Sequence, residues 1–474
     1  MTHRLDARAL TAPLQPLDAP AWVVGGGLRD ALLGRPVADL DVVTQGDPAA
    51  QAKALAIAHG ASRFQLSRDF GAWRVTGGSL GVQVDVMPLL GGSLESDLAR
   101  RDFTINALAL SASGEGQVID RHGGLDDLAD GRMALVGPSA LLDDPVRVLR
   151  LARIADALGF RIDASAADAA RAAAPGIGGA PGERVMEEFM RIIMAPDPGR
   201  AVRALDALGG LGALVPQLED CRGVDQSEYH HLDVLGHTLE VLDNVVAIEA
   251  DPEPVFRADA GLVTASLAEP LADDLTRGQA LRLTALMHDM AKAETRGVMD
   301  SGRITFIGHD RRGAEMADAW MRRMRTSNRL REFVVRGVRD HLVLGFMVHR
   351  QPLTLAQYDR YLRRVAPDPV EAIVLSVADR MATDGPRTTP IQITRHLALA
   401  RDMLAAHARI AAMEPIRPPL DGAALAQVLE RPPGPWLAEL LVATREEQLM
   451  GRVHDGPTAV AFAQRWDQAH PAHP

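Results

Sequence analysis

The chain has a single cysteine, no apolar run long enough to cross a bilayer, and no excess of positive charge over its 474 residues. One cysteine, Cys221, cannot form a disulfide framework within the chain. A membrane-spanning helix needs about 18 or more consecutive apolar residues, which the sequence does not contain. The opening segment, MTHRLDARALTAPLQPLDAP, also lacks the apolar core of a secretory signal. We therefore expect a cytoplasmic protein without a membrane role.

The net charge is −11, with 47% hydrophobic and 24% charged residues, which is an ordinary soluble composition. Long-range repulsion would slow association with a polyanion, so binding to nucleic acid would depend on local basic patches. The arginine-rich segment 321–339 is one candidate patch. The same pattern is equally typical of a solvated helix face.

The length exceeds that of one ordinary hydrophobic core and predicts two to four domains of common size. Strings rich in proline and glycine predict breaks between helices at 174–183, 251–254, 414–422 and 430–436. No internal repeat or low-complexity tract is evident.

The most informative segment is 23–44, VVGGGLRDALLGRPVADLDVVT, in which Asp39 and Asp41 occur on a short apolar strand. Side chains alternate along a strand, so these two carboxylates point the same way while Leu40 and Val42 point to the buried side. Two carboxylates on one face can share a magnesium ion. The alternative is an ordinary pair of surface residues on an edge strand.

The glycines before this strand indicate a phosphate site. Gly25, Gly26 and Gly27 let the backbone approach a triphosphate closely, and the N-terminus of a helix starting near Leu28 favours anions. Arg29 adds a charged fork. Phosphate and metal would then meet at one place, although a plain turn is the simpler interpretation.

Two further segments add polar groups. In VQVDVM, residues 82–87, Asp85 alternates with valines and is either a third carboxylate beside the pair or a solvated strand residue. The segment 100–110, RRDFTINALAL, supplies a cluster that can hold a sugar and phosphates: Arg100, Arg101, Asp102 and Asn106.

Together, GGGLRDALLG, the Asp39/Asp41 pair and RRDFTINALAL closely resemble the class II tRNA nucleotidyltransferase and bacterial poly(A) polymerase family. The resemblance implies an α+β fold, with a small mixed or antiparallel sheet in a nucleotidyltransferase head (1–140). A helical neck (141–222), an HD domain (223–390) and a helical tail (391–474) would follow. It also implies CTP or ATP as nucleotide, the tRNA 3′ end as partner, and Mg²⁺ held by Asp39 and Asp41, with Asp85 as a further catalytic carboxylate.

The segment 143–160, DDPVRVLRLARIADALGF, resembles the base-reading neck helix of this family. On one helix, Asp143, Asp144 and Arg147 would share a face and offer acceptors and donors to the Watson–Crick edge of a base. The family usually has glutamate in the first position, so Asp143 shortens the reach. Arg150 and Arg153 are expected to face phosphates. In isolation, the pattern would indicate only a pair of N-capping aspartates and a surface arginine.

A second set of polar residues lies on apolar helical stripes after the neck: His237, His288, Asp289, His309, His341 and Asp379. Burying such groups without partners is costly, and a metal ion relieves that cost for all of them. We expect a divalent transition metal there. Other histidines, namely His230, His231, His349 and His396, are expected to be hydrogen-bonded core or surface residues.

The order His, His-Asp, Asp resembles HD-domain metal phosphohydrolases, and His309 and His341 fall where some members bind a second ion. Two metals suit phosphoester hydrolysis, so the resemblance implies phosphatase or 2′,3′-cyclic phosphodiesterase activity. Lys292 departs from the family pattern in that alanine, not glycine, precedes it.

The stretch between DVMPLLGGS and RRD is only LESDLA, whereas full CCA-adding relatives have a longer flexible segment there. A missing loop resembles the CC-adding subset. The expected function is addition of CMP to the tRNA 3′ end, with AMP addition left open. A poly(A) polymerase is a second interpretation, although the basic tail of that branch is absent. A third is an HD phosphohydrolase whose head only binds RNA.

Overall fold

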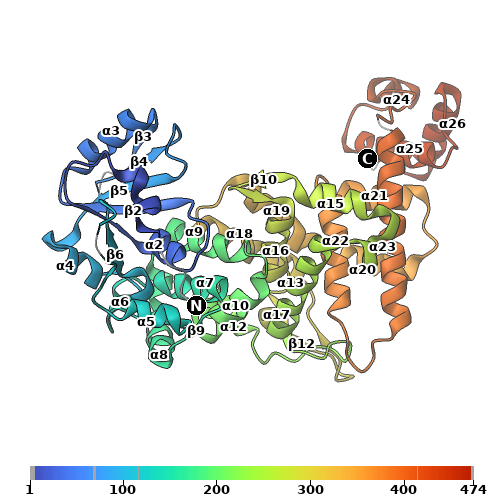
Figure 1. Cartoon of the computed structure of the whole chain (residues 1–474). Coiled ribbons are helices and arrows are strands. Elements are labelled where there is room, and N and C mark those ends of the chain that lie inside the picture. Colours follow the sequence, from blue (N-terminus) through green and yellow to red (C-terminus); the bar gives the residue numbers. More distant parts are fainter. Residues whose placement is uncertain (1–5, 68–70, 116, 414, 471–474) are drawn as a thin grey trace. The chain divides into compact units, whose positions relative to one another are not determined.

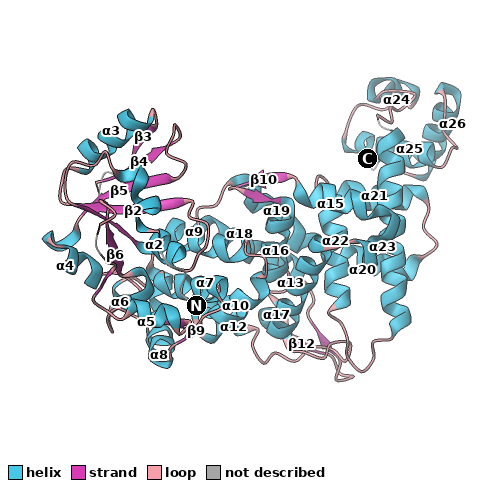
Figure 2. Ribbon diagram, viewed as in Figure 1, coloured by secondary structure: helices cyan, strands magenta, loops and turns pink. Residues whose placement is uncertain are grey.

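The computed structural model describes residues 6–67, 71–115, 117–413 and 415–470, and the chain folds into two compact units. The first unit comprises residues up to 195 and 200–214, and the second comprises 196–199 and the chain from 215 onward. Helices dominate both units, and the only large sheet of the described chain lies in the first (Figures 1 and 2). The predicted α+β class is confirmed.

The sheet of the first unit has seven strands in the order β3-β4-β5-β2-β1-β6-β7. It is mixed, because β2 and β5 are parallel while the other neighbours are antiparallel. The strands are β1 (Ala21–Val24), β2 (Asp39–Thr44), β3 (Ser62–Ser67), β4 (Ala72–Thr76), β5 (Gln83–Pro88), β6 (Leu108–Ser111) and β7 (Ile119–Asp120).

Short helices connect these strands: α1 (Ala7–Thr11), α2 (Gly25–Leu32), α3 (Pro48–His59), α4 (Leu94–Ala99) and α5 (Gly124–Ala129). The caps of α3 follow from its sequence: the Asp47 carboxylate accepts from the first free backbone amides, and Gly60 ends the helix in a left-handed conformation.

The neck region is helical, as the resemblance implies, apart from the short pair β8 (Arg132–Met133) and β9 (Arg161–Ile162). Its helices are α6 (Ala140–Asp143), α7 (Arg147–Leu158), α8 (Ala164–Ala173), α9 (Gly182–Ile193), α10 (Pro198–Ala207) and α11 (Gly210–Leu214). One stripe of α9, Val185, Phe189 and Ile192, is buried as its spacing predicts.

The second unit is built from helices. Those before the tail are α12 (Pro216–Asp220), α13 (Val234–Ala250), α14 (Glu253–Phe256), α15 (Ala260–Ala268), α16 (Arg277–Met287), α17 (Lys292–Thr295), α18 (His309–Arg323), α19 (Asn328–Asp340), α20 (Val343–Met347), α21 (Leu355–Val365), α22 (Pro369–Met381) and α23 (Pro390–Met413). Two short hairpins, β10 (Pro270–Ala272) with β11 (Leu275–Thr276) and β12 (Gly297–Val298) with β13 (Ile304–Thr305), interrupt them.

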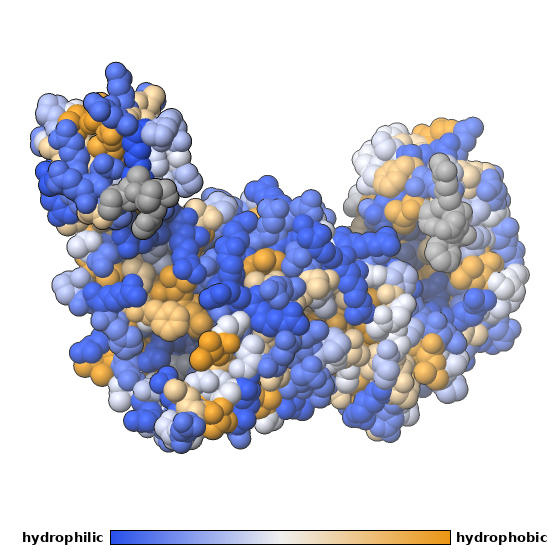
Figure 3. All heavy atoms as spheres, turned by 180° about the vertical axis from the view of Figure 1, so that it is seen from behind, coloured by the Kyte–Doolittle hydropathy of each residue, from blue (hydrophilic) through white to orange (hydrophobic). Residues whose placement is uncertain are grey.

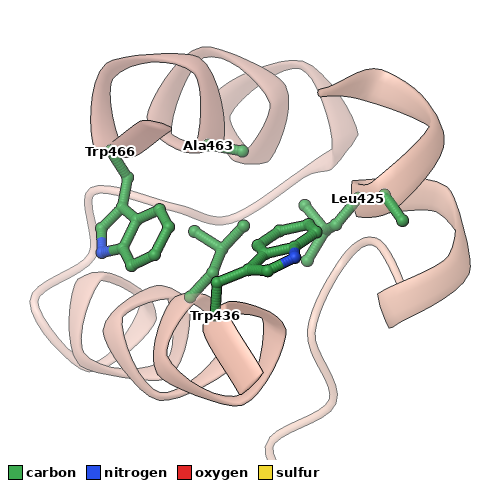
Figure 4. Close-up of a cluster of buried hydrophobic side chains, with 6 residues drawn as sticks. Leu425, Trp436, Ala463 and Trp466 are labelled. Atoms are coloured by element: carbon green, nitrogen blue, oxygen red, sulfur yellow. The ribbon is translucent and has the colours of Figure 1, made fainter. Parts of the chain in front are cut away.

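The tail consists of α24 (Gly422–Val428), α25 (Pro435–Leu449) and α26 (Gly456–Ala469). These helices share a cluster of buried side chains that includes Leu425, Trp436, Leu440, Ala463 and Trp466 (Figure 4). Large aromatic side chains supply most of the apolar area of so small a cluster.

The predicted breaks agree with these bounds. Residues 251–252 lie between α13 and α14, 415–421 precede α24, and 430–434 lie between α24 and α25, while residue 414 lies outside the described residues. In the range 174–183, a 3-10 segment, η4 (Ala174–Gly179), precedes α9, which begins at Gly182. The ends of the predicted ranges thus extend into the following helices.

No described helix is long and apolar enough to span a bilayer. The face drawn in Figure 3 is largely hydrophilic, with apolar residues in small groups.

The arginine-rich segment 321–339 falls on the end of α18 and on α19, and much of its charge is paired within the unit. Asp318 binds both Arg322 and Arg331, while Arg336 binds Asp368 at 2.7 Å. This pairing favours the interpretation as a helix surface over that of a nucleic-acid patch.

Candidate nucleotide site and candidate metal centre

Asp39 and Asp41 lie on β2, in the middle of the sheet of the first unit. Leu40 and Val42 between and after them are buried, Asp39 is exposed, and Asp41 is partly buried. The alternation predicted for this strand is therefore confirmed. Because β2 is not an edge strand, the interpretation as an ordinary edge-strand pair is wrong.

The carboxyl group of Asp41 is largely removed from water and lies among charges of both signs. Burial, together with the nearby charges of Asp85 and Asp39, raises its pKa to about 6, although Arg101 and Arg150 act in the opposite direction. A divalent cation at this position would favour the ionised form and displace the proton. The Asp41 carboxylate would therefore gain from a bound cation.

Asp85 lies beside Asp41 in the register of the parallel pair β2 and β5, so the predicted third carboxylate is next to the pair. Both of its oxygens accept from Arg74 on β4, at 2.7 Å each. Such a bidentate pair fixes the orientation of the Asp85 carboxylate. Asp85 therefore acts on Asp41 through its charge.

The glycines fix the distance between α2 and β2. The helix begins at Gly25, three residues earlier than predicted. Gly25 has φ +73°, and a Cβ there would lie 2.8 Å from Asp41 Oδ2, while a Cβ on Gly27 would lie 2.5 Å from the Asp39 carbonyl oxygen. Only a residue without a side chain lets the helix N-terminus approach the carboxylates so closely.

A hollow of about 190 Å³ opens beside these elements. Most of the predicted nucleotide residues line it, and the lining set is Gly25, Gly26, Asp41, Leu90, Asp97, Arg100, Arg101, Asp102, Asn106, Arg147 and Arg150. The hollow therefore combines a helix N-terminus, one cation-ready carboxylate and several guanidinium groups. Such a surface is suited to a magnesium-bound triphosphate.

Arg29 is not in this lining, contrary to the prediction that it reaches the phosphates. Its guanidinium binds Asp30 and donates to Asn106 Oδ1 at 2.9 Å. The Asn106 amide in turn donates to Asp102 Oδ1 at 3.1 Å. Arg29 thus holds the Asn106 amide, and through it Asp102, in one orientation.

The predicted shared face of Asp143, Asp144 and Arg147 is wrong. Asp143 is the last residue of α6, Asp144 is extended with φ −147°, and α7 begins at Arg147. Pro145 is the physical reason, because a proline disfavours the helical conformation of the residue before it. Asp143 is exposed and accepts from Ser139 Oγ at 2.9 Å, outside the hollow.

Arg147 lines the hollow and donates to the carbonyl oxygens of Ala140 and Arg100, both at 3.1 Å. Asp144 lies 3.8 Å from Arg147 and accepts from Arg184 at 2.6 Å. These two residues remain neighbours in space although they do not share a helix.

Sequence reasoning missed Glu188 on α9, which organises the arginines of α7. Its side chain is 10% exposed and accepts from Arg153 Nε at 2.9 Å and from Arg191 at 3.3 Å, with Arg150 at 3.8 Å. Arg150 also reaches Asp102 at 3.2 Å. Arg150 therefore lines the hollow as predicted, but Arg153 is bound to Glu188 and does not.

In the second unit, the six residues of the HD pattern come from five helices or their ends. His237 lies on α13, His288 and Asp289 follow α16, His309 begins α18, His341 follows α19, and Asp379 lies on α22. All four histidines and Asp289 are buried. The predicted set is thus brought together from positions more than a hundred residues apart.

Every histidine of the set has its Nδ1 atom next to a backbone carbonyl oxygen: Ala382 for His237 (3.3 Å), Ala285 for His288 (2.7 Å), Phe306 for His309 (2.6 Å) and Val338 for His341 (2.6 Å). The Nδ1 atom must then carry the hydrogen, which leaves the lone pair on Nε2. Metal-binding histidines are held in this way.

Asp289 is shared by two groups of potential ligands. Its Oδ2 lies 3.1 Å from His288 Nε2 and 3.6 Å from His237 Nε2, while Oδ1 lies 3.3 Å from His309 Nε2 and 3.7 Å from His341 Nε2. The ligand atoms of each trio lie within 4.8 Å of one another. Asp379 Oδ1 lies 3.0 Å from His237 Nε2.

The residues fit divalent metal ions. Asp289 Oδ1 and the Nε2 atoms of His288, His309 and His341 are buried without a hydrogen-bond partner among the described residues, while Asp289 Oδ2 forms an ion pair with Lys292. Unsatisfied buried groups at one point are expensive unless something binds them. Imidazole and carboxylate are the ligands that divalent transition metals prefer.

A cleft of about 840 Å³ opens onto this centre. Asp289, His309, His341 and Asp379 line it together with Lys292, whose Nζ lies 2.6 Å from Asp289 Oδ2. Sequence reasoning did not foresee that Tyr229, Arg303, Arg380 and Arg395 line this cleft, nor that His230, His349 and His396, expected as core or surface residues, also line it. No local pattern marks them, because they come from segments that only the fold brings together. His396 is buried and hydrogen-bonded to Ser376, as expected.

Comparison with known proteins identifies the family of this chain. Sequence profiles match the Poly A polymerase head domain at 21–134, the probable RNA and SrmB-binding site of polymerase A at 159–221, and the HD domain at 234–384. An A-adding tRNA nucleotidyltransferase from Deinococcus radiodurans is 34% identical over 97% of this chain and 98% of its own length. The chain belongs to the tRNA nucleotidyltransferase family.

Other members of this family are similar over most of the chain. A CC-adding tRNA nucleotidyltransferase from Thermus thermophilus is 31% identical, covering 94% of this chain and 93% of its own. Among solved structures, a CCA-adding enzyme in complex with CTP aligns with a TM-score of 0.65 at 18% identity, covering 98% of this chain and 95% of its own. The structural likeness extends the fold assignment to the whole chain.

Gly25→Ala tests the close approach of α2 to β2 in this nucleotidyltransferase. We expect nucleotide addition to fall by roughly tenfold or more, because a positive φ costs an alanine about 1–2 kcal/mol and its Cβ would displace Asp41. The rate of addition to tRNA under single turnover measures it. Gly26→Ala is the matched variant, since its Cβ would approach no atom closer than 3.6 Å and should have the smaller effect.

Glu188→Gln tests the anchor of the arginines in the neck. We expect the free energy of unfolding to fall by about 2 kcal/mol. The fall should be smaller than for a fully buried ion pair, because the Arg150 side chain is 40% exposed. Urea unfolding measures the change. Glu187→Gln, which removes an exposed pair with Arg191, should shift it by less than about 0.5 kcal/mol. Equal effects of the two substitutions would contradict the anchoring role.

Proposed function

We propose that this tRNA nucleotidyltransferase adds CMP from CTP to the 3′ end of tRNA in the hollow of the first unit, with Asp39 and Asp41 holding Mg²⁺. The observation that carries the proposal is the approach of the α2 N-terminus to Asp41, which places phosphate-binding amides next to a cation-ready carboxylate. When bound, magnesium would lower the pKa of the attacking hydroxyl and neutralise the departing pyrophosphate.

The residues of the chain would divide the remaining tasks. The backbone at Gly25 and Gly26, with Arg100 and Arg101, would bind the triphosphate. Asp102 Oδ2 is buried without a hydrogen-bond donor apart from its ion pair with Arg150, and would accept from a ribose hydroxyl. The tRNA 3′-oxygen then attacks the α-phosphorus, and the bond to pyrophosphate breaks.

Arg147 and Asp144 are the proposed readers of the base. They offer the donors and the acceptor that match the edge of a cytosine or an adenine. Asp143 is left out, because it is exposed and bound to Ser139.

The preference for CMP rests on the short connection between β5 and Arg100. After β5, a brief 3-10 segment (Leu90–Gly92) leads into α4, whose Ser93 caps the helix and whose Asp97 binds Arg101 at 2.9 Å. Because α4 is capped by Ser93 and held by Asp97, this connection contains no counterpart of the longer flexible segment of full CCA-adding relatives. AMP addition is the second candidate, because the Deinococcus radiodurans relative that matches almost the whole chain is A-adding.

The experiment offers purified enzyme tRNA ending before CCA, after C and after CC, each with labelled CTP or ATP. The proposal predicts two added cytidines on the first substrate and no product from ATP. Product from the CC-ending tRNA and ATP alone would establish the second candidate. A long adenosine ladder would identify a poly(A) polymerase and contradict both.

We further propose that the HD centre hydrolyses phosphate esters. The four unsatisfied buried ligand atoms and the histidines held at Nδ1 support metal binding, and the adjoining cleft, which is lined by several arginines, suits a phosphate. When bound, the metal ions would activate water for attack on phosphorus. In the chain, Lys292 is placed to neutralise charge on the phosphoryl oxygens.

A further inference from the structure

A second hollow adjoins the HD cleft in the second unit, and one exposed aromatic side chain stands between them. The second hollow measures about 320 Å³. Leu342 and Phe346 line both spaces. Asp310, which lines the second, directly follows the metal-centre residue His309. The two hollows are therefore neighbouring parts of one surface at the metal centre.

Phe346 is unusual because it is 64% exposed, although it lies on α20 between two concave surfaces. An exposed aromatic ring costs solvation free energy unless a ligand covers it. In single-stranded nucleic-acid sites, such rings serve as platforms on which bases stack.

The second hollow combines an apolar floor with positive charge. Its apolar lining includes Val343, Met347, Leu353 and Tyr361, and its charged lining consists of Asp310 with Arg350, Arg360 and Arg364. Arg360 binds Glu446 and Arg364 binds Asp340. Arg350 is exposed and forms no ion pair with any residue that the structure describes. It is thus free to bind an anion.

The HD cleft, which Phe346 also lines, carries arginines as well. Arg303 and Arg395 are exposed on its rim, and Arg380 lies deeper beside Asp379. Cationic groups therefore lie on both sides of one aromatic ring. The order of charge, ring and charge is that of a strand in which phosphates alternate with bases.

We propose that the HD cleft and the second hollow together bind a single-stranded RNA end. The terminal 3′-phosphate lies in the HD cleft, and the penultimate nucleotide lies in the second hollow. Phe346 stacks on the base of the penultimate nucleotide, and Arg350 binds the phosphate that joins it to the terminal nucleotide. The inference rests on the proposed hydrolase function and narrows its substrate to RNA ends. Water attacks the terminal phosphorus, the bond from phosphorus to the 3′-oxygen breaks, and a 3′-hydroxyl and inorganic phosphate are released.

The test compares kcat/KM of the full-length enzyme for cytidine 3′-phosphate and for the dinucleotide CpC bearing a 3′-phosphate. We expect the dinucleotide to be preferred by roughly tenfold, a typical value for one stacked base and one bound phosphate. Phe346→Ala and Arg350→Ala should each bring the ratio close to one. Ile57→Ala, an exposed apolar residue of the first unit, and Arg409→Ala, an exposed arginine of α23, are matched controls that should preserve the ratio.

A second readout does not depend on turnover. A CpC analogue with 4-thiouridine as its first base is irradiated with enzyme in the presence of a chelator, and the crosslinked peptide is identified by mass spectrometry. We expect the crosslink within residues 342–350, and its loss in Phe346→Ala. Hydrolysis of both substrates with equal kcat/KM, or a crosslink elsewhere, overturns the inference and leaves the hydrolase proposal standing. Hydrolysis of neither substrate overturns the hydrolase proposal itself.

Discussion

Asp41→Ala is expected to abolish nucleotide addition, by roughly three orders of magnitude or more, because the cation that activates the attacking hydroxyl loses its most buried ligand. Hydrolysis at the HD centre should persist, since none of its residues lies in the first unit. Stability should be retained or slightly raised, because burial and the charges of Asp85 and Asp39 already disfavour the ionised carboxylate. Labelled-nucleotide incorporation and thermal melting measure the two effects.

A matched control for Asp41→Ala is Glu95→Ala, which removes an exposed carboxylate from α4 in the same unit. It should leave both activities unchanged. Near-normal addition by a folded Asp41→Ala variant would contradict the assignment of the hollow as the catalytic site, whatever the HD centre does. Circular dichroism of both variants checks that the fold is intact.

Asp289→Ala is expected to have the opposite pattern. The two Asp289 oxygens belong to both trios of ligands, so removing the carboxylate should lower metal affinity by roughly a hundredfold or more. This loss exceeds the typical effect of changing a residue that only supports a metal ligand. Hydrolysis of phosphate esters should disappear while nucleotide addition continues. Metal content measured by mass spectrometry and the two activity assays, on the same preparation, give the result.

The substitution also leaves Lys292 without its partner, so folding must be checked independently. Asp289→Asn keeps the shape but offers one oxygen fewer, and should show the same pattern. Glu315→Ala, on the exposed side of α18, is the control for metal content. Loss of both activities in a folded Asp289 variant would show that the two sites are not independent.

Local periodicity explains what could be predicted from the sequence. The alternation of Asp39, Leu40 and Asp41 depends only on the geometry of a strand, and the apolar stripes around His237 depend only on that of a helix. Both were therefore predictable, and so was the grouping of the HD residues once the order of the pattern was recognised.

The errors arose where tertiary partners determine the outcome. Arg29 and Arg153 carry the charge that a phosphate site requires, but Asn106 and Glu188 bind them from segments far away in the sequence. The pairing of Asp85 with Arg74 requires the register of two strands, which no local pattern gives. The break before Arg147 did have a signal, because Pro145 follows Asp144 directly.

The sharing of one carboxylate by two trios of ligands has a consequence for how such a centre changes during evolution. A substitution at His237 or at His341 removes a member of one trio and leaves the other complete, whereas a substitution at Asp289 dismantles both at once. If each trio holds one metal ion as proposed, altering a single imidazole would leave the other ion bound and so provide a mononuclear intermediate. Loss of the central aspartate would remove a ligand from both ions at once.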